Sequence, residues 1–462
     1  MKYAVFTFDG YGLPIAWQLQ KEGKDVLVAQ VEDQRDVLSE LEKNAKPEDK
    51  ASKARRLSQY DGMLEKQPVD KVIEKLRKAK DPSEWFAFFD LNHLFKFSEE
   101  VSKLGVHGNF PTVGDYCYEI DRELAKDFVN ENYPMMRVAD KHRFNKASEA
   151  KAFLSKSDDF WVLKGLEEDA RTVVPDVDDL ELANGQILDA LAQDPDEYES
   201  AGFILELLIP GALELTPGIV FYDGEPVHTY MCIENKPLGA GNVGPMTDCA
   251  QDLVFATDME NKINKIAFPP IVHEMAKQHK GAFYWDASIY ADPRTGKLYF
   301  GEFCANRPGY NSVYTEISLA ASASKYFEGI ARGKSPLPEN SVAASVRLFN
   351  FHQSPEGGVQ GGSTVAFRPR IENELWLNDV RKAQRRLCSV GYKPDIGVIT
   401  GSGNSVTEAA KRAYRNVDEF SFEGAYYRPL FDFTSREYKT SIANRLDYGL
   451  QRGLYKIGFG IG

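Results

Sequence analysis

The chain has 462 residues, of which 43% are hydrophobic and 27% charged, and its formal net charge is −13 at pH 7. This length exceeds what one hydrophobic core holds, so we expect about three domains in a chain whose composition is typical of a folded protein. The negative charge repels nucleic-acid backbones and anionic membranes, so we expect neither as a partner.

The first residues are not typical of a signal peptide, because the apolar run is broken by Asp9, Gly10 and Gly12. No stretch of about 18 apolar residues follows that would cross a bilayer. The five cysteines have no CxxC spacing, which argues against a disulfide framework and a thiolate zinc site. We therefore expect a protein of the reducing cytoplasm.

Residues 1–111 are predicted to form an N-terminal Rossmann-like domain. Residues 2–8 form a β-type run, 14–24 a helix and 25–31 a second strand, and this alternation predicts a parallel sheet. Asp9, Gly10 and Gly12 follow the first strand, where such sheets bind ligands. The alternative is a tight turn that merely requires glycine.

Residues 112–335 are predicted to form a mixed α+β domain with a run of antiparallel strands. It ends with a hairpin whose turn is DPRTGK and with a helical stretch. A Gly, Pro and Ser-rich linker then leads to a small β-rich domain, residues 340–435. The Gly-rich tail, 436–462, is either mobile or docked.

The segment GEFCANRPGYNS, on the second strand of that hairpin, carries Glu302, Asn306 and Arg307. Asp286 lies on the opposite strand and can supply another oxygen. Carboxylate and amide oxygens suit Mg²⁺, which takes its remaining ligands from water and nucleotide phosphates. The alternative is a surface hairpin with a cross-strand salt bridge.

A second group is cationic. Lys164 ends the apolar strand FWVLK, so it is expected to point into a cleft where a phosphate neutralises it, although a snorkelling lysine is the alternative. The other cations are Arg122 and Lys126 on one helix and Arg171 beyond the strand. Glu206 interrupts the apolar segment ILELLIPG and must be partnered if it is buried.

Two longer segments, PTVGDYCYEIDRELAKDF and TGSGNSVTEAAKRAYRNV, are similar to segments of one known family. Together with FWVLK, ILELLIPG and GEFCANR, they make the chain resemble the ATP-grasp superfamily, and within it the phosphoribosylamine–glycine ligases of purine synthesis. The resemblance covers about residues 1–435. It implies an ATP-grasp fold whose two lobes clamp ATP, and it implies ATP and Mg²⁺ (or Mn²⁺) as cofactors.

The resemblance also implies a nucleotide site. Arg122 takes the place of the family's first phosphate-binding lysine and Lys164 matches the second. Glu206 and the backbone to Leu208 would hold adenine, while Glu214 would approach the ribose or the substrate.

The implied metal site is less complete. Glu302 matches the metal-binding glutamate, and Asp286 lies opposite. The family has its asparagine two residues after that glutamate, where this chain has Cys304, so Asn306 and Cys304 compete for the amide position. Arg307 and Arg171, with Lys164, would offset charge on the transferring phosphoryl group.

The substrate segments depart from the family. At the glycine turn of Asp9, Gly10 and Gly12, the polar groups associated with a phosphorylated amine are missing, and the substrate loop is only half retained around Asn242 and Thr247. The implied function is an ATP- and Mg²⁺-dependent carboxylate–amine ligase that acts through an acyl phosphate on small molecules, with a different amine. Two alternatives are a genuine phosphoribosylamine–glycine ligase and an inactive ATP-binding scaffold.

Overall fold

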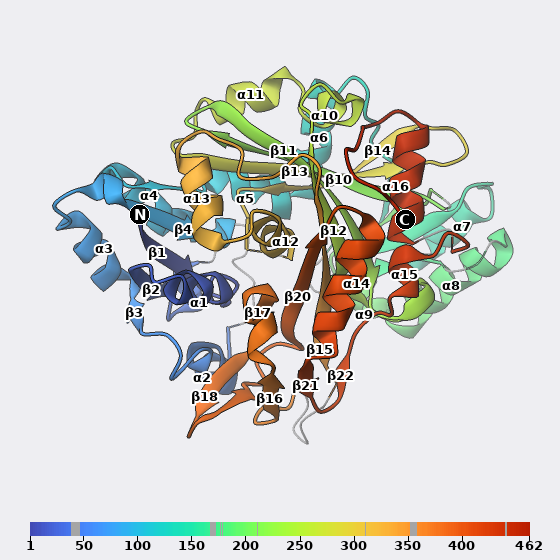
Figure 1. The fold of residues 1–462 in the computed structure, drawn as a ribbon. Coiled ribbons are helices and arrows are strands. Elements are labelled where there is room, and N and C mark those ends of the chain that lie inside the picture. Colours follow the sequence, from blue (N-terminus) through green and yellow to red (C-terminus); the bar gives the residue numbers. More distant parts are fainter. Residues whose placement is uncertain are drawn as a thin grey trace. The chain divides into compact units, whose positions relative to one another are not determined.

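The computed structural model describes residues 1–37, 47–166, 172–175, 177, 179–209, 211–309, 311–351, 358–438 and 441–462, apart from the side chain of residue 311. Its contacts divide the chain into two compact units (Figure 1). Unit 1 comprises Met1–Ala125, Glu214–Ser288 and Glu302–Gly462. Unit 2 comprises Lys126–Leu213 and Ile289–Gly301.

Unit 1 begins with the expected parallel sheet. Its strand order is β3-β2-β1-β4-β5, and the neighbouring strands pair in parallel, which confirms the predicted strand–helix alternation. The strands are β1 Lys2–Thr7, β2 Val26–Gln30, β3 Lys66–Pro68, β4 Trp85–Phe89 and β5 His107–Gly108. The helices are α1 Leu13–Lys21, α2 Lys50–Ser58, α3 Val69–Arg77 and α4 Phe95–Val101. Phe6 and Phe89 stack in its core.

A second, larger sheet carries the site described below. In the described residues its order is β14-β13-β10-β11-β12-β15-β20-β17, and β22 pairs with β15. Its strands are β10 Leu213–Tyr222, β11 Glu225–Pro237, β12 Met246–Thr257, β13 Ala282–Ala291, β14 Leu298–Ala305, β15 Val342–Asn350, β17 Leu375–Leu377, β20 Asp395–Gly403 and β22 Ala425–Tyr426. Because β15 pairs antiparallel with β12, this sheet continues across the domain boundary predicted at residue 340.

A smaller sheet has the order β18-β19-β16-β21. Its strands are β16 Thr364–Phe367, β18 Val380–Ala383, β19 Arg386–Ser389 and β21 Phe420–Phe422. The remaining helices of this unit are α5 Val113–Ile120, α10 Lys262–Ala267, α11 Pro270–Ala276, α12 Asn311–Leu319, α13 Ala323–Ala331, α14 Val406–Val417, α15 Phe431–Thr434 and α16 Ile442–Gln451.

Two helix starts in unit 1 follow directly from the sequence. Thr112 and Asp115 form a capping box at the start of α5, so each side chain bonds a backbone N–H that the helix leaves unpaired. Ser405 caps α14 by accepting from the N–H of Glu408. The C-terminal tail is docked: α16 packs on β11, and Ser405 forms a β-bridge with Gly460.

Unit 2 is a four-stranded antiparallel sheet with the order β6-β9-β7-β8, covered by helices. The strands are β6 Lys141–Phe144, β7 Trp161–Gly165, β8 Thr172–Val173 and β9 Phe203–Leu207. The helices are α7 Ala147–Leu154, α8 Leu180–Gln193, α9 Pro195–Glu199 and most of α6 Arg122–Asn132. Leu163, Ile187 and Phe203 are buried in its core.

None of the helices in the described part of the chain is long and apolar enough to cross a bilayer.

Candidate active site

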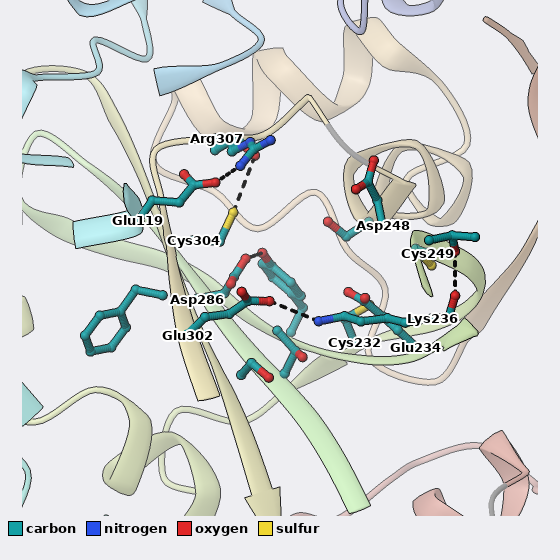
Figure 2. A pocket seen from close by; sticks show the side chains of 16 residues that line it. Glu119, Cys232, Glu234, Lys236, Asp248, Cys249, Asp286, Glu302, Cys304 and Arg307 are labelled. Carbon is teal, nitrogen blue, oxygen red and sulfur yellow. Dashed lines mark hydrogen bonds and ion pairs between the residues drawn. The ribbon is translucent and has the colours of Figure 1, made fainter. Parts of the chain in front are cut away.

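A polar cavity of about 310 Å³ lies in unit 1, over β10, β11, β13 and β14 (Figure 2). Successive side chains of a strand point to opposite faces. Glu234 and Lys236 therefore share one face of β11, while Glu302 and Cys304 share one face of β14, and all four line the cavity. This alternation brings chemistry-bearing side chains from several strands to one place.

Lys236 is the cation in the middle of the cavity. Its ammonium lies 2.8 Å from Glu214 and 3.0 Å from Glu302, and Figure 2 shows it pointing at Glu302. Ser288 donates a hydrogen bond of 2.5 Å to the same Glu214 carboxylate. The Glu214 side chain is 14% exposed and that of Glu302 is 65% exposed, so Lys236 bridges a mostly enclosed carboxylate and an open one.

Asp286 lies on β13, next to the strand of Glu302, and Tyr230 donates a hydrogen bond of 3.4 Å to it. Burial raises the pKa of Asp286 well above its usual value, and the carboxylates of Glu234, Glu302 and Glu119 raise it further. Burial likewise raises the pKa of Glu234 to about 7, against the opposing effect of Lys236. The carboxyl groups of the cavity therefore oppose one another's ionisation, and a bound cation would favour their charged forms.

Glu119, at the end of α5, forms the other side of the cavity. Arg307 makes an ion pair with it, and Asn92 donates a hydrogen bond of 2.6 Å to its carboxylate. Arg307 follows the end of β14, and its side chain is 26% exposed and lines the cavity.

The carboxylates of the cavity are the type of ligand that suits a divalent cation, because Mg²⁺ prefers oxygen ligands. Asp286 and Glu302 lie on neighbouring strands and both line the cavity. In the described residues, no group of three or more His, Cys, Asp or Glu side chains is arranged to hold a metal by itself. A cation here would therefore take its remaining ligands from water or from a nucleotide, as Mg²⁺ commonly does.

Asn306 and Cys304, the two candidates for the amide position, lie in different surroundings. Strand β14 ends at Ala305, and Asn306 takes a left-handed φ of 52°. This turn directs its amide away from the cavity, where it donates a hydrogen bond of 3.3 Å to Asp115. Cys304, two residues after Glu302, lines the cavity instead. Asn306 is therefore not placed to share a cation with Glu302.

Unit 2 contains a separate cationic cluster. Lys126 on α6 and Lys164 on β7 both form ion pairs with Glu206 on β9, the latter at 2.6 Å. Although burial alone would raise it, the pKa of Glu206 is held below its usual value by Lys164 and Lys126. Two ammonium groups on one carboxylate leave a net positive charge. The expectation that a buried Glu206 must be partnered is met by these lysines.

The segment expected to contact adenine is the end of β9, an inner strand of this sheet. The N–H of Leu208 donates to the carbonyl of Phe160 at 2.8 Å, and that of Leu207 to Asp140 at 2.8 Å. These two donors are therefore engaged within unit 2. Adenine recognition through the Leu208 N–H would require that bond to open.

Arg122 is exposed at the start of α6, and the structure does not place it on Glu206. Lys126, one turn further along the same helix, is 6% exposed and takes that position. Lys126 is therefore a second candidate, beside Arg122, for the first phosphate-binding cation. Arg171 lies outside the described residues.

The glycine turn after β1 is filled by the chain's own side chains. The N–H of Gly10 donates to Thr7 at 2.9 Å and that of Gly12 to Asp90 at 2.7 Å. Tyr392 donates a hydrogen bond of 3.0 Å to Asp9. These contacts satisfy the turn internally, so the structure does not hold Asp9, Gly10 and Gly12 open for a substrate.

The loop around Asn242 and Thr247, which only partly resembles the family's substrate loop, leads into the start of β12. Thr247 lines the cavity and donates a hydrogen bond of 2.6 Å to the carbonyl of Lys236. Asn242 does not line it, and its amide oxygen accepts from Arg428 at 3.0 Å. Of these two predicted substrate contacts, the structure brings Thr247 to the cavity.

Sequence reasoning missed Glu119, Glu234 and Lys236. The sequence could have indicated the last two, because Cys232, Glu234 and Lys236 alternate at the end of an otherwise apolar strand, a pattern that places them on one face. It carried no such indication for Glu119, since an acidic residue near the end of a helix is ordinary.

The sequence matches no family model and no curated protein. Solved structures do match. A phosphoribosylamine–glycine ligase from Thermotoga maritima is 16% identical, with a TM-score of 0.61, over 93% of this chain and 99% of that chain. A biotin carboxylase complex with β,γ-ATP from Campylobacter jejuni is 13% identical, with a TM-score of 0.55, over 99% and 98%. The biotin carboxylase domain of the Hydrogenobacter thermophilus 2-oxoglutarate carboxylase, bound to MgADP and bicarbonate, is 12% identical, with a TM-score of 0.53, over 98% and 95%.

Proposed function

Because the chain has the fold of the ATP-grasp enzymes, we propose that it is an ATP-dependent ligase that joins a small-molecule carboxylate to an amine and releases ADP and phosphate. The observation that carries the proposal is the cavity of unit 1, where carboxylates suited to a divalent cation lie beside Lys236 and Arg307. Two of the similar structures support the nucleotide and the metal, since one is a complex with β,γ-ATP and another with MgADP.

In this proposal, Lys126 and Lys164 bind nucleotide phosphates. Their shared carboxylate, Glu206, keeps both ammonium groups together in the absence of the nucleotide. A phosphate oxygen that replaces one of these contacts forms a charge-assisted hydrogen bond of similar kind. The net positive charge of the cluster favours this exchange.

The metal-binding residues are Asp286 and Glu302, with Mg²⁺ or Mn²⁺ as the ion. When bound, that ion offsets charge on the transferring phosphoryl group. Glu302 is the more exposed carboxylate of the two and bonds Lys236. Displacing Lys236 from Glu302 frees one side of its ammonium for a substrate oxygen, while the ammonium stays paired with Glu214, which Ser288 holds by a hydrogen bond.

The residues that face the reacting groups are Lys236 and Arg307. Both are cations at the edge of a carboxylate cavity, so each can bind a substrate carboxylate or stabilise negative charge on an acyl phosphate. No nucleophile from the protein is needed, because phosphorylation itself activates the carboxyl group. Activation of this kind requires water to be kept from the cavity.

We propose an amine other than phosphoribosylamine. The contacts of Asp90 with Gly12 and of Thr7 with Gly10 occupy the backbone donors that an anionic amine would use at the glycine turn. A genuine phosphoribosylamine–glycine ligase of purine synthesis is the competing candidate, supported by the fold of the Thermotoga maritima enzyme.

The test is ADP release with hydroxylamine as a general nucleophile, over a panel of carboxylates. Carboxylate-dependent ADP release with hydroxamate formation is the expected result, and its absence with every carboxylate contradicts the ligase. Replacing hydroxylamine by natural amines then identifies the acceptor. Rapid turnover with glycine and phosphoribosylamine supports the competing candidate.

An inactive nucleotide-binding scaffold is the second candidate function, because Cys304 faces the cavity where the resembling family has an amide. Calorimetry with a non-hydrolysable ATP analogue separates the two. Binding without ADP release in any mixture favours the scaffold, whereas binding with turnover favours the ligase.

A further inference from the structure

Lys236 lies between two residues that are held by arginines of the C-terminal segment, which we define as residues 428–451. Asn235 is 2% exposed and accepts a hydrogen bond of 2.5 Å from Arg445 on α16. The carbonyl of Pro237 accepts a hydrogen bond of 2.6 Å from Arg428. The backbone on both sides of Lys236 is therefore fixed by the same segment.

The contact of Arg445 comes from the face of the sheet opposite the cavity. Neighbouring residues of a strand point to opposite faces, so Asn235 faces α16 while Glu234 and Lys236 face the cavity. Helix α16 packs on β11, and Figure 1 draws it beside the large sheet. Asn235 is also bonded to Gln251 of the next strand at 2.8 Å, which makes it a fixed point for Arg445.

Arg428 also bonds the loop that precedes β12. Its guanidinium donates to the amide oxygen of Asn242 at 3.0 Å and is paired with Asp432 at 2.9 Å, and both charged groups are fully buried. Asn242 has a left-handed φ of 60°, so this loop is held in a strained conformation.

The charge of Arg445 also acts on the cavity wall. It is 6% exposed, and the ionisable groups that act most strongly on it are Glu214 and Glu234. These two carboxylates line the cavity or bond Lys236. Both the hydrogen bond and the charge of Arg445 are therefore directed at the strands that present Lys236.

We propose that Arg445 and Arg428 are positioning residues for Lys236, so that the C-terminal segment is a working part of the active site. The inference rests on the proposed function in one respect, that Lys236 touches substrate. It goes beyond that function because it gives a role to two arginines that no step of the proposed reaction uses. Loss of the segment disables the cavity without touching the nucleotide-binding lysines of unit 2.

The experiment measures how fast individual lysines react with an amine-specific reagent, by mass spectrometry of the folded full-length chain. The variants are Arg445→Met, Arg445→Lys and, as a matched control, Arg452→Met at the exposed end of the same helix. In wild type, Lys236 reacts slowly, because it is 18% exposed and bonds Glu214 and Glu302. Lys393, also in unit 1, is the internal reference.

Arg445→Met is expected to raise the reaction rate of Lys236 at least about fivefold, the factor expected for losing one hydrogen bond. Arg445→Lys should give a smaller rise, and Arg452→Met none. An unchanged Lys236 in Arg445→Met, an equal rise in Arg452→Met, or an equal rise at Lys393 overturns the inference. If Arg445→Met fails to fold, the smaller rise in Arg445→Lys decides.

These rates need no substrate. A wild type that binds no nucleotide would therefore refute the proposed function while leaving the positioning role to be decided by the labelling. Once substrates are known, Arg445→Lys should lower kcat more than it raises KM for ATP. A proportional change in both would contradict a role confined to Lys236.

Discussion

Replacing Lys126 by Met tests which residue of α6 binds the nucleotide. In unit 2, Lys126 and Lys164 share the Glu206 carboxylate, which leaves one net positive charge for a phosphate. The substitution reduces that net charge to zero. A hydrogen bond to a charged group contributes about 1.5–3 kcal/mol, so the affinity for an ATP analogue should fall between about tenfold and about a hundredfold.

The matched control is Arg122→Met, four residues earlier on the same helix. Arg122 is exposed, so we expect its loss to change the affinity less than about twofold. The double variant Lys126→Met with Glu206→Gln restores the net positive charge and should recover part of the loss. The assay is calorimetric titration with a non-hydrolysable ATP analogue and Mg²⁺. Normal binding by Lys126→Met together with a tenfold loss in Arg122→Met would refute this reasoning.

Two further predictions concern stability. A Cβ at Gly218 would lie 2.1 Å from the ring of Tyr230, so Gly218→Ala should lower the free energy of unfolding by about 1–3 kcal/mol in urea. Gly185→Ala, which meets no described atom within 4 Å in α8, should raise it by about 0.5–1 kcal/mol; equal effects would contradict the packing argument. Burial raises the pKa of Asp90 to about 7, so its contribution to stability is present below about pH 4 and is lost as the pH rises through about 7. This loss is about 4 kcal/mol at about 1.4 kcal/mol per pKa unit, and Asp90→Asn should abolish it; parallel pH profiles of the unfolding midpoint would contradict this.

Local patterns predicted much of the fold. The alternation of β1, α1 and β2 appears in the sequence because glycine turns separate a buried strand from an amphipathic helix. The Ser405 cap likewise follows from residue types a few positions apart. Such features depend on short-range chemistry, which a single sequence displays.

The site was less predictable, because it depends on which face of each element becomes buried. Arg122 and Lys126 are one helical turn apart and lie on the same side of α6, so periodicity cannot choose between them. Asn306 leaves the cavity because β14 ends one residue before it. The contacts of Arg445 and Asn235 join positions 210 residues apart, and no local pattern indicates them.

The most direct test of the account is metal binding in the presence of ATP. Mn²⁺, followed by electron paramagnetic resonance, should bind wild type tightly only when ATP is present, since the described side chains do not hold a metal alone. Both Glu302→Gln in unit 1 and Lys164→Met in unit 2 should weaken this ternary complex by about tenfold or more. Glu260→Gln, at an exposed ion pair, should leave it unchanged. Wild-type Mn²⁺–ATP binding by Glu302→Gln would contradict the proposed metal-binding role of that carboxylate, and wild-type binding by Lys164→Met would contradict the proposed nucleotide-binding role of that lysine.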